Sequence, residues 1–172
     1  YLASSFLSPN INRRKDEWGG SFEKRAAFPR AILQEVREHA GDGVAVLAKI
    51  NMADGVKGGL WLDESIPFAQ LIEQDGTVDA LALTGGSSLL NPMFLFRGDV
   101  PMKQMAATQM WLLKLGMNMF GKFVFQNYPY EPLYFLDYAR QFRREVSLPL
   151  VLLGGVTNHD HMTTAMEEGF DF

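Results

Sequence analysis

The sequence predicts an α/β fold in which parallel strands alternate with helices. Three short apolar runs, at residues 44–48, 78–83 and 149–153, lack the polar alternation of a half-exposed strand. Such runs are typical of parallel strands that are buried on both faces. Stretches with helical spacing of apolar residues separate the runs, and each run ends at a polar or glycine-rich turn. This order indicates βα units, either in a doubly wound sheet or in a (β/α)8 barrel.

The length of the chain favours an incomplete barrel. A βα unit takes about 30 residues and a full barrel about 250, whereas this chain has 172. We therefore expect one domain, residues 1–172, that forms about the second half of a (β/α)8 TIM barrel: strands 5 to 7 and the start of strand 8. Ligands gather at the carboxyl ends of the strands in both architectures, so we expect the chemistry there.

Start and stop signals predict four helices between these strands. The first covers residues 21–39, with Ser21 as a candidate N-cap and with a kink at Pro29. The remaining helices and the start of a fourth strand are predicted at residues 63–74, 132–146, 159–168 and 170–172.

A long insertion at about residues 87–130 interrupts the regular spacing. It is far longer than the usual βα connection of about 2–6 residues, and a helix is predicted within it at residues 101–115. One interpretation is a lid or substrate wall for an apolar ligand, and the other is a hydrophobic cluster or subunit contact. Six of the nine methionines lie in this Met- and Phe-rich segment: Met93, Met102, Met105, Met110, Met117 and Met119.

Composition limits the classes of function. The chain is 47% apolar with a net charge of −4, and it has no run of basic residues that would follow a phosphate backbone, so we expect no nucleic-acid partner. It contains no cysteine, which excludes disulfides and thiolate chemistry in these residues. No apolar stretch reaches the roughly 18 residues of a membrane span. We expect no membrane partner and a cytoplasmic location.

A glycine turn after the third apolar run is the first candidate site. Gly154, Gly155 and Val156 connect a buried strand to a helix, where free backbone N–H groups and the helix dipole favour a phosphate. The alternative is a purely steric need for glycine, since a similar turn follows the second run at residues 85–87.

Lys49 is the second candidate, as the only charge at the end of an apolar strand. Burial of an unpaired ammonium is costly, so we expect its side chain to be held by an anion or to reach solvent. A salt bridge to Asp54 or Asp63 would explain it without function. A Schiff-base lysine in an aldolase-like barrel is a further alternative.

Tyr1 is the third candidate, because a phenol with a pKa near 10 can donate a proton to a developing carbanion. On its own it is only a terminal aromatic residue. His159 and His161 stand two residues apart and so point to different sides of a helix, which favours a solvated helix start over a metal site. We predict no metal site.

The N-terminal block resembles the signature of the old yellow enzyme family of FMN-dependent NAD(P)H:flavin oxidoreductases. The resemblance continues at residues 46–51, at the turn of Gly85 and Gly86, and at residues 152–155, and so covers essentially the whole chain. The matching residues of the block are Tyr1, Leu2, Phe6, Leu7, Ser8, Pro9, Asn12, Arg14, Asp16, Trp18, Gly19, Gly20, Ser21, Glu23 and Arg25.

The resemblance implies a barrel with FMN at the carboxyl ends of its strands and NAD(P)H as reductant. Tyr1 matches the tyrosine that protonates the substrate carbon after hydride transfer to an activated C=C bond. Lys49 matches the basic residue near the flavin N1/O2 edge, and Gly154, Gly155 and Val156 match the turn that holds the FMN phosphate. The expected partner is an enone-like small molecule. The resemblance is also compatible with a homo-oligomer.

Some features depart from the family pattern. Ser5 stands where many members have Gln or Glu, Trp18 replaces Tyr and Lys24 replaces Asn; we expect these three positions to belong to the scaffold. The family's His-His or His-Asn pair for the substrate carbonyl would precede Tyr1, and a Gly-Arg phosphate element would follow Phe172. We therefore expect these residues alone to be inactive, and a non-catalytic half-barrel that acts as a structural or interaction module is the alternative function.

Overall fold

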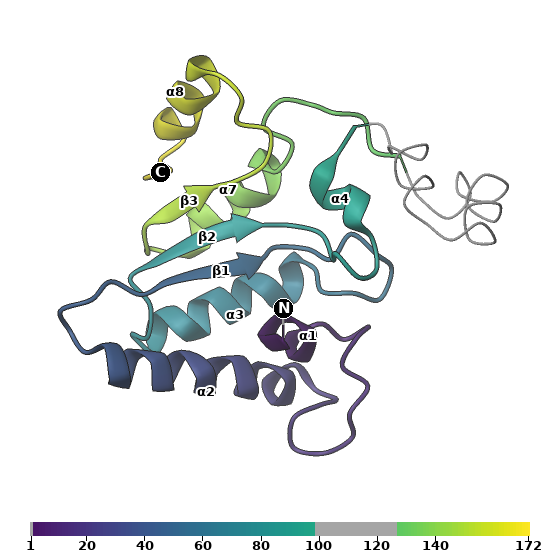
Figure 1. Cartoon of the computed structure of the whole chain (residues 1–172), viewed down its shortest axis with the longest axis vertical. Helices are drawn as coiled ribbons and strands as arrows, with labels where there is room; N and C mark the ends of the chain where they lie inside the picture. Colours follow the sequence, from purple (N-terminus) through teal and green to yellow (C-terminus); the bar gives the residue numbers. More distant parts are fainter. Residues whose placement is uncertain (1, 99–126) are drawn as a thin grey trace, which may run out of the picture.

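The computed structural model describes residues 2–98 and 127–172. Helices and short parallel strands alternate along most of this part of the chain (Figure 1). In chain order the elements are α1 (Leu2–Leu7), α2 (Phe22–Ala40), β1 (Leu47–Asn51), α3 (Leu62–Gln74), β2 (Ala80–Thr84), α4 (Pro92–Phe96), α7 (Leu136–Glu145), β3 (Leu150–Leu152) and α8 (His159–Glu167).

The three strands form one parallel sheet in the order β1-β2-β3. Helix α3 leads from β1 to β2 and α7 precedes β3, so each parallel pairing is reached through a helical crossover, as the strand spacing predicts. Figure 1 shows α2 and α3 together on one side of the sheet and α4 beyond the carboxyl ends of β1 and β2. The α/β class predicted from the sequence is therefore confirmed.

The two faces of the sheet differ in burial. The face against the helices is apolar and closed: its side chains are 0% to 9% exposed, and they come from Ala48, Ile50, Leu81, Leu83, Leu150 and Leu152. On the opposite face Lys49, Ala82 and Val151 lie side by side in register. Leu47, also on that face, is 58% exposed. The prediction that the first strand is buried on both faces is therefore wrong for the described residues, because helices cover only one of its faces.

Strand β1 also lies three residues later than the predicted run of 44–48. Its start is set by pairing with β2, which aligns Leu47 with Ala80. The preceding residues are held differently, since Val46 N donates to Asp79 Oδ2 at 2.6 Å and Arg37 donates to the Val44 carbonyl at 3.2 Å. Lys49 consequently lies in the middle of the strand and not at its end.

The predicted helices are found, with one late start. Helix α2 follows Ser21 directly and continues through Pro29, although the Ser21 side chain makes no capping hydrogen bond. Helices α3 and α8 agree with their predictions within one residue. Helix α7 starts at Leu136 instead of residue 132, because residues 131–135 pack against the turn at Gly155, where Leu133 N donates to the Gly155 carbonyl at 3.2 Å.

The remaining differences are local. Helix α1 and the short α4 were not expected from the sequence. The predicted strand start at residues 170–172 is not assigned as a strand, although Asp171 N donates to the Leu150 carbonyl and Leu152 N to the Phe172 carbonyl, both at 3.0 Å. The helix predicted at residues 101–115 lies outside the described residues.

Candidate functional site

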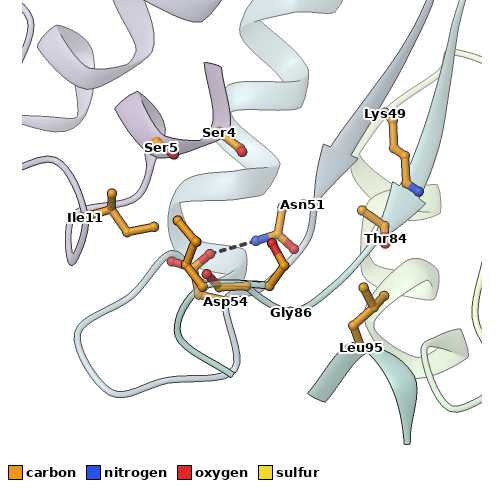
Figure 2. Close-up of a pocket in the computed structure, with 12 residues that line it drawn as sticks. Ser4, Ser5, Ile11, Lys49, Asn51, Asp54, Thr84, Gly86 and Leu95 are labelled. Atoms are coloured by element: carbon orange, nitrogen blue, oxygen red, sulfur yellow. Dashed lines mark hydrogen bonds between the residues drawn. The ribbon is translucent and has the colours of Figure 1, made fainter. Parts of the chain in front are cut away.

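A cavity of about 350 Å³ lies at the carboxyl ends of β1 and β2. This is the edge of the sheet at which the sequence predicts the chemistry. Figure 2 shows side chains from α1, β1, β2 and the turns that follow the two strands converging on it. Its lining residues are Ser4, Ser5, Ile11, Lys49, Asn51, Asp54, Thr84, Gly86, Ser87, Ser88, Leu89 and Leu95.

Lys49 is the cation of this cavity. Its side chain is exposed on the open face of β1, as the third of the five strand residues. Among the described residues it forms a salt bridge with neither Asp54 nor Asp63, the two carboxylates that the sequence offers as partners. The salt-bridge explanation for Lys49 therefore has no support in this part of the chain. The side chain reaches solvent, as the other alternative predicts, and its ammonium group is accessible to an anionic ligand.

Asp54 is a buried carboxylate that the sequence analysis considered only as a partner of Lys49. It is 3% exposed and accepts three hydrogen bonds: from Ser8 Oγ at 2.6 Å, from Asn51 Nδ2 at 2.7 Å and from Leu60 N at 2.7 Å. These donors satisfy the carboxylate without a counter-ion. Asp54 thereby ties α1, the end of β1 and the loop before α3 into the wall of the cavity.

Asn51, the last residue of β1, presents an unpaired acceptor at the same place. Its Nδ2 donates to Asp54 (Figure 2), while its Oδ1 is buried and accepts no hydrogen bond from the described residues. Such an atom is uncommon in a folded protein. Asn51 is not among the site residues predicted from the sequence, although its place two residues after Lys49 puts both side chains on one face of the strand.

The turn at Gly154, Gly155 and Val156 keeps its backbone donors free. Both glycines have positive φ, of 103° and 79°, which other residues rarely adopt. The N–H groups of the three residues donate no hydrogen bond within the described chain. They precede α8, where the capping Asn158 side chain accepts from His161 N at 2.9 Å. This arrangement of free donors before a helix N-terminus suits an anion.

The polar residues of the N-terminal signature are occupied mainly in holding its own loop. Asn12 donates to the carbonyls of Phe6 and Trp18 at 2.7 Å. Arg25, 5% exposed, donates to the carbonyls of Leu7 and Gly20 at 3.0 and 2.8 Å and pairs with Glu64. These bonds fix α1 against the cavity. Tyr1, the predicted proton donor, lies outside the described residues.

Two of the three departures from the family pattern do lie in the scaffold. Trp18 packs edge-on against Phe28, with 5.8 Å between ring centroids, and Lys24 is exposed on α2. Ser5 differs, because it lines the cavity. The expectation that Ser5 belongs to the scaffold alone is therefore wrong.

The described part of the long insertion combines a packed aromatic cluster with an arginine whose Nε has no hydrogen-bond partner among the described residues. Phe94 is 5% exposed and contacts Tyr128 and Phe135. Arg97 lies over both of these rings and over Tyr134, with 4.8 to 5.8 Å from its Cζ to the ring centroids of this cluster. These residues form a packed cluster, whereas Ser87, Ser88, Leu89 and Leu95 of the same insertion line the cavity, so both interpretations stay open. Five of the six methionines fall outside the described residues, so the predicted lid stays a prediction.

Residues 2–98 and 127–172 hold neither a candidate metal cluster nor a membrane-spanning helix. Those residues contain no group of three or more His, Cys, Asp or Glu side chains that could hold a metal ion. None of their helices is long and apolar enough to cross a membrane.

Comparison with known proteins identifies a family and close relatives. The model of the NADH:flavin oxidoreductase / NADH oxidase family matches residues 1–85. A 4,4'-dithiodibutanoate disulfide reductase of Rhodococcus erythropolis is 52% identical over 172 residues, which are 100% of this chain and 43% of that protein. An NADH oxidase of Thermoanaerobacter brockii is 36% identical over 86 residues, 50% of this chain and 13% of that protein. The chain thus spans less than half the length of these relatives.

Solved structures support the fold. A 2-naphthoyl-CoA reductase in complex with 2-naphthoyl-CoA superposes with a TM-score of 0.72 at 24% identity, covering 98% of this chain and 21% of the other. Histamine dehydrogenase from Rhizobium sp. 4-9 superposes with a TM-score of 0.67 at 21% identity, covering 97% and 19%. At these identities the likeness concerns the fold alone, and it confirms the predicted class, part of a (β/α)8 barrel.

Proposed function

Because the chain belongs to the NADH:flavin oxidoreductase / NADH oxidase family, we propose that it forms part of an FMN-dependent oxidoreductase that reduces an activated C=C bond with NAD(P)H. The acceptor in this proposal is an α,β-unsaturated carbonyl compound. The observation that carries it is the Lys49 ammonium, which has no salt bridge among the described residues and lies beside a cavity at the carboxyl ends of β1 and β2. Ligands occupy this edge of the sheet in α/β barrels.

The residues present fit FMN in two respects. Lys49 offers a cation at the cavity, and the N–H groups of Gly154 and Gly155 donate no hydrogen bond within the described chain. FMN carries a ring that gains negative charge on reduction, and it ends in a phosphate.

Each residue has a separate task in the proposed reaction. FMN, when bound, supplies the hydride carrier between NAD(P)H and the acceptor. With FMN bound, Lys49 would stabilise negative charge on the reduced ring, and the N–H groups of Gly154, Gly155 and Val156 would hold the phosphate. Tyr1 donates a proton to the substrate carbon next to the one that receives hydride.

The first test is the colour of the purified whole protein. We expect a yellow protein with flavin absorbance bands that bleach when NADH or NADPH is added without oxygen. A colourless protein that FMN cannot reconstitute would contradict the proposal and favour the half-barrel as a non-catalytic structural or interaction module.

The proton-donor role of Tyr1 predicts a selective kinetic defect. The Tyr1→Phe variant should slow reoxidation by an enone by about 10²-fold or more, because general acid catalysis contributes about 10²–10⁴-fold. Reduction by NAD(P)H should change less than twofold, since it needs no proton from this residue. Stopped-flow measurement of the two half-reactions separates them. An equal loss in both halves would exclude the role.

A second acceptor class is favoured by the relative that is 52% identical and is named a disulfide reductase. In that reaction a hydride and a proton convert one disulfide into two thiols. Turnover of 2-cyclohexenone and of 4,4'-dithiodibutanoate by the whole protein, followed by NAD(P)H oxidation, decides between the two acceptors. A rate with the disulfide that exceeds the enone rate by tenfold or more would replace the first proposal with the second.

A further inference from the structure

Arg97 differs from the other shielded arginines of the described chain. Each of the others that is buried or half-buried forms a salt bridge with an Asp or Glu side chain: Arg25, Arg30, Arg37, Arg140 and Arg143. Arg97 is half-buried as well, but it forms no salt bridge and no side-chain hydrogen bond with the described residues. A guanidinium is always charged and offers five N–H donors, so this cation lacks the anion that its counterparts have.

Aromatic rings and a strained backbone hold Arg97 in place instead. Its Cζ lies 4.8, 4.9 and 5.2 Å from the ring centroids of Phe94, Tyr128 and Tyr134. Such contacts use the face of the guanidinium and none of its N–H groups. Nε is buried without a partner, whereas the two terminal nitrogens are not among the buried atoms that lack one. Arg97 also has a φ of 52°, which residues other than glycine rarely adopt and which is typical of ligand sites.

The position of Arg97 places this cation at the ligand edge of the sheet. It follows α4, beyond the carboxyl ends of β1 and β2 (Figure 1). Leu95, two residues earlier, lines the cavity, and two residues span at most about 7 Å of chain. The ring of Tyr134 contacts both Arg97 and the glycine turn, since a Cβ added to Gly154 or Gly155 would lie 2.9 Å from it. Arg97 therefore lies next to the proposed flavin site.

The surroundings of Arg97 suit a phosphorylated nucleoside. An arginine with free N–H groups binds phosphate through two parallel hydrogen bonds. The ring of Tyr130 is 48% exposed and contacts the ring of Tyr134, with 6.3 Å between centroids. Nucleic-acid bases stack on exposed aromatic rings of this kind. Among the proposed reactants, NADPH carries a 2′-phosphate on its adenosine, and NADH lacks it.

We propose that Arg97 binds the 2′-phosphate of NADPH and thereby makes NADPH the preferred reductant. This inference rests on the proposed function, because it requires a nicotinamide nucleotide as hydride donor. The nicotinamide ring has to reach the flavin, whereas the adenosine end extends away from it. Arg97 touches no reacting atom in this arrangement, so it determines specificity and not the rate of hydride transfer.

Reduction of the flavin in the whole protein measures this preference. Stopped-flow traces at increasing NADPH or NADH, without oxygen, give a dissociation constant and a limiting rate constant for each nucleotide. We expect the unchanged protein to bind NADPH at least about tenfold more tightly than NADH, the value of a charge-assisted phosphate contact. In Arg97→Met this advantage should disappear, while binding of NADH and both limiting rates change by less than about twofold.

Two further variants separate the contact from charge and folding. Arg97→Lys keeps the charge but loses the forked donors, so it should retain only part of the preference. Arg144→Met is the matched control, because Arg144 is exposed on α7, near the start of β3 at the opposite edge of the sheet. It should keep the full preference. Thermal unfolding shows whether each variant is folded.

A binding measurement on the unchanged protein needs no variant. Calorimetric titration should show about tenfold tighter binding of 2′,5′-ADP than of 5′-ADP, because only the first carries the 2′-phosphate. This result carries the test if Arg97→Met does not fold. Equal binding of the two nucleotides would overturn the inference.

The remaining outcomes distinguish the inference from the proposed function. Equal use of NADPH and NADH, or an Arg97→Met variant that keeps the preference, would overturn the inference and leave the proposed function intact. An Arg97→Met variant that loses affinity only for a carboxylated enone, such as 4-oxo-2-pentenoate, would assign Arg97 to the acceptor and also overturn it. A flavin that neither nucleotide reduces would overturn the proposed function and the inference with it.

Discussion

Two glycine turns of similar sequence follow neighbouring strands, and they differ in what their backbones do. Each turn needs a glycine against Phe135: an added Cβ would lie 2.6 Å from that ring at both Gly85 and Gly154. In the first turn, however, Gly86 N donates to the Ala53 carbonyl at 2.6 Å and Ser87 N to the Asp54 carbonyl at 3.2 Å. In the second turn, the N–H groups of residues 154–156 find no such acceptor in the described chain. The two turns share a sequence pattern, but the backbone N–H groups of the first are bonded within the protein. Those of the second are available to an anion.

The largest expected effect of this difference is at Gly155. A Gly155→Ala substitution strains a φ of 79° and brings Cβ to 2.6 Å from Leu133 N, so it should shift the N–H groups that are proposed to hold the phosphate. We expect the unchanged protein to bind FMN at least tenfold more tightly than riboflavin. The variant should lose most of this preference. Its stability should fall by about 1–3 kcal/mol. Fluorescence titration with both flavins measures the preference.

Gly86→Ala is the matched control for that experiment. Gly86 has a φ of 88°, and an added Cβ would lie 2.8 Å from Leu95 N, so the backbone strain is similar. Because the N–H groups of this turn are already bonded, the variant should lose similar stability but keep its preference for FMN. A loss of the preference in both variants would show that the two turns do not differ in function.

Lys49→Met tests the proposed contact to the flavin ring, whereas Gly155→Ala tests the proposed contact to the phosphate. Lys49 is proposed to act on the flavin ring and not on the phosphate. The variant should therefore lose affinity for FMN and for riboflavin by the same factor, about tenfold. The midpoint potential of the flavin should become more negative, since a cation no longer stabilises the reduced ring. Spectroelectrochemical titration measures the potential.

Lys24→Met provides the reference for this charge change. Lys24 is exposed on α2, so its loss should alter neither flavin binding nor the potential. If Lys49→Met weakened FMN but not riboflavin, Lys49 would belong with the phosphate turn instead, and the division between the two regions would fail.

The smallest effect is expected at Asp79, near the amino end of the sheet. Hydrogen bonds from Val46 N and from Arg37 hold the pKa of Asp79 below its ordinary value. A lowered pKa in the folded state stabilises the protein above the unfolded value of about 4. That stability is lost as the pH falls through the folded pKa.

The test of Asp79 is thermal unfolding of Asp79→Asn at pH 7 and at pH 3. The variant should be less stable than the unchanged protein at pH 7, and this difference should shrink at pH 3. Its flavin affinity should not change. An effect on flavin binding would mean that both ends of the sheet contribute to the site.

Local patterns predicted much of the fold. The apolar spacing and glycine stops placed α2, α3 and α8 closely, because these signals lie within the helix itself. The start of β1 could not be found in this way. It depends on the alignment of Leu47 with Ala80 and on the bonds of Asp79, which join residues more than 30 positions apart.

The site was predictable where one residue suffices and not where several cooperate. Lys49 stands out as a lone charge in an apolar run, and the glycines mark their turns. The set of Ser8, Asn51 and Asp54 combines residues 46 positions apart, and each of them alone is an ordinary polar residue. One signal could have placed Asn51 near the site: it follows Lys49 by two residues, and side chains two residues apart on a strand lie on the same face.

The position of Lys49 on β1 also bears on how this sheet behaves during folding. Strand β1 lies at the edge of the described sheet, and Leu47 on its open face is 58% exposed. Exposed edge strands with apolar side chains promote aggregation, and a lysine on such a strand opposes it. Removal of the charge should therefore lower the yield of soluble protein on refolding at high concentration, independently of any ligand. Lys49, the residue proposed to contact the flavin, would thus also oppose aggregation at this edge.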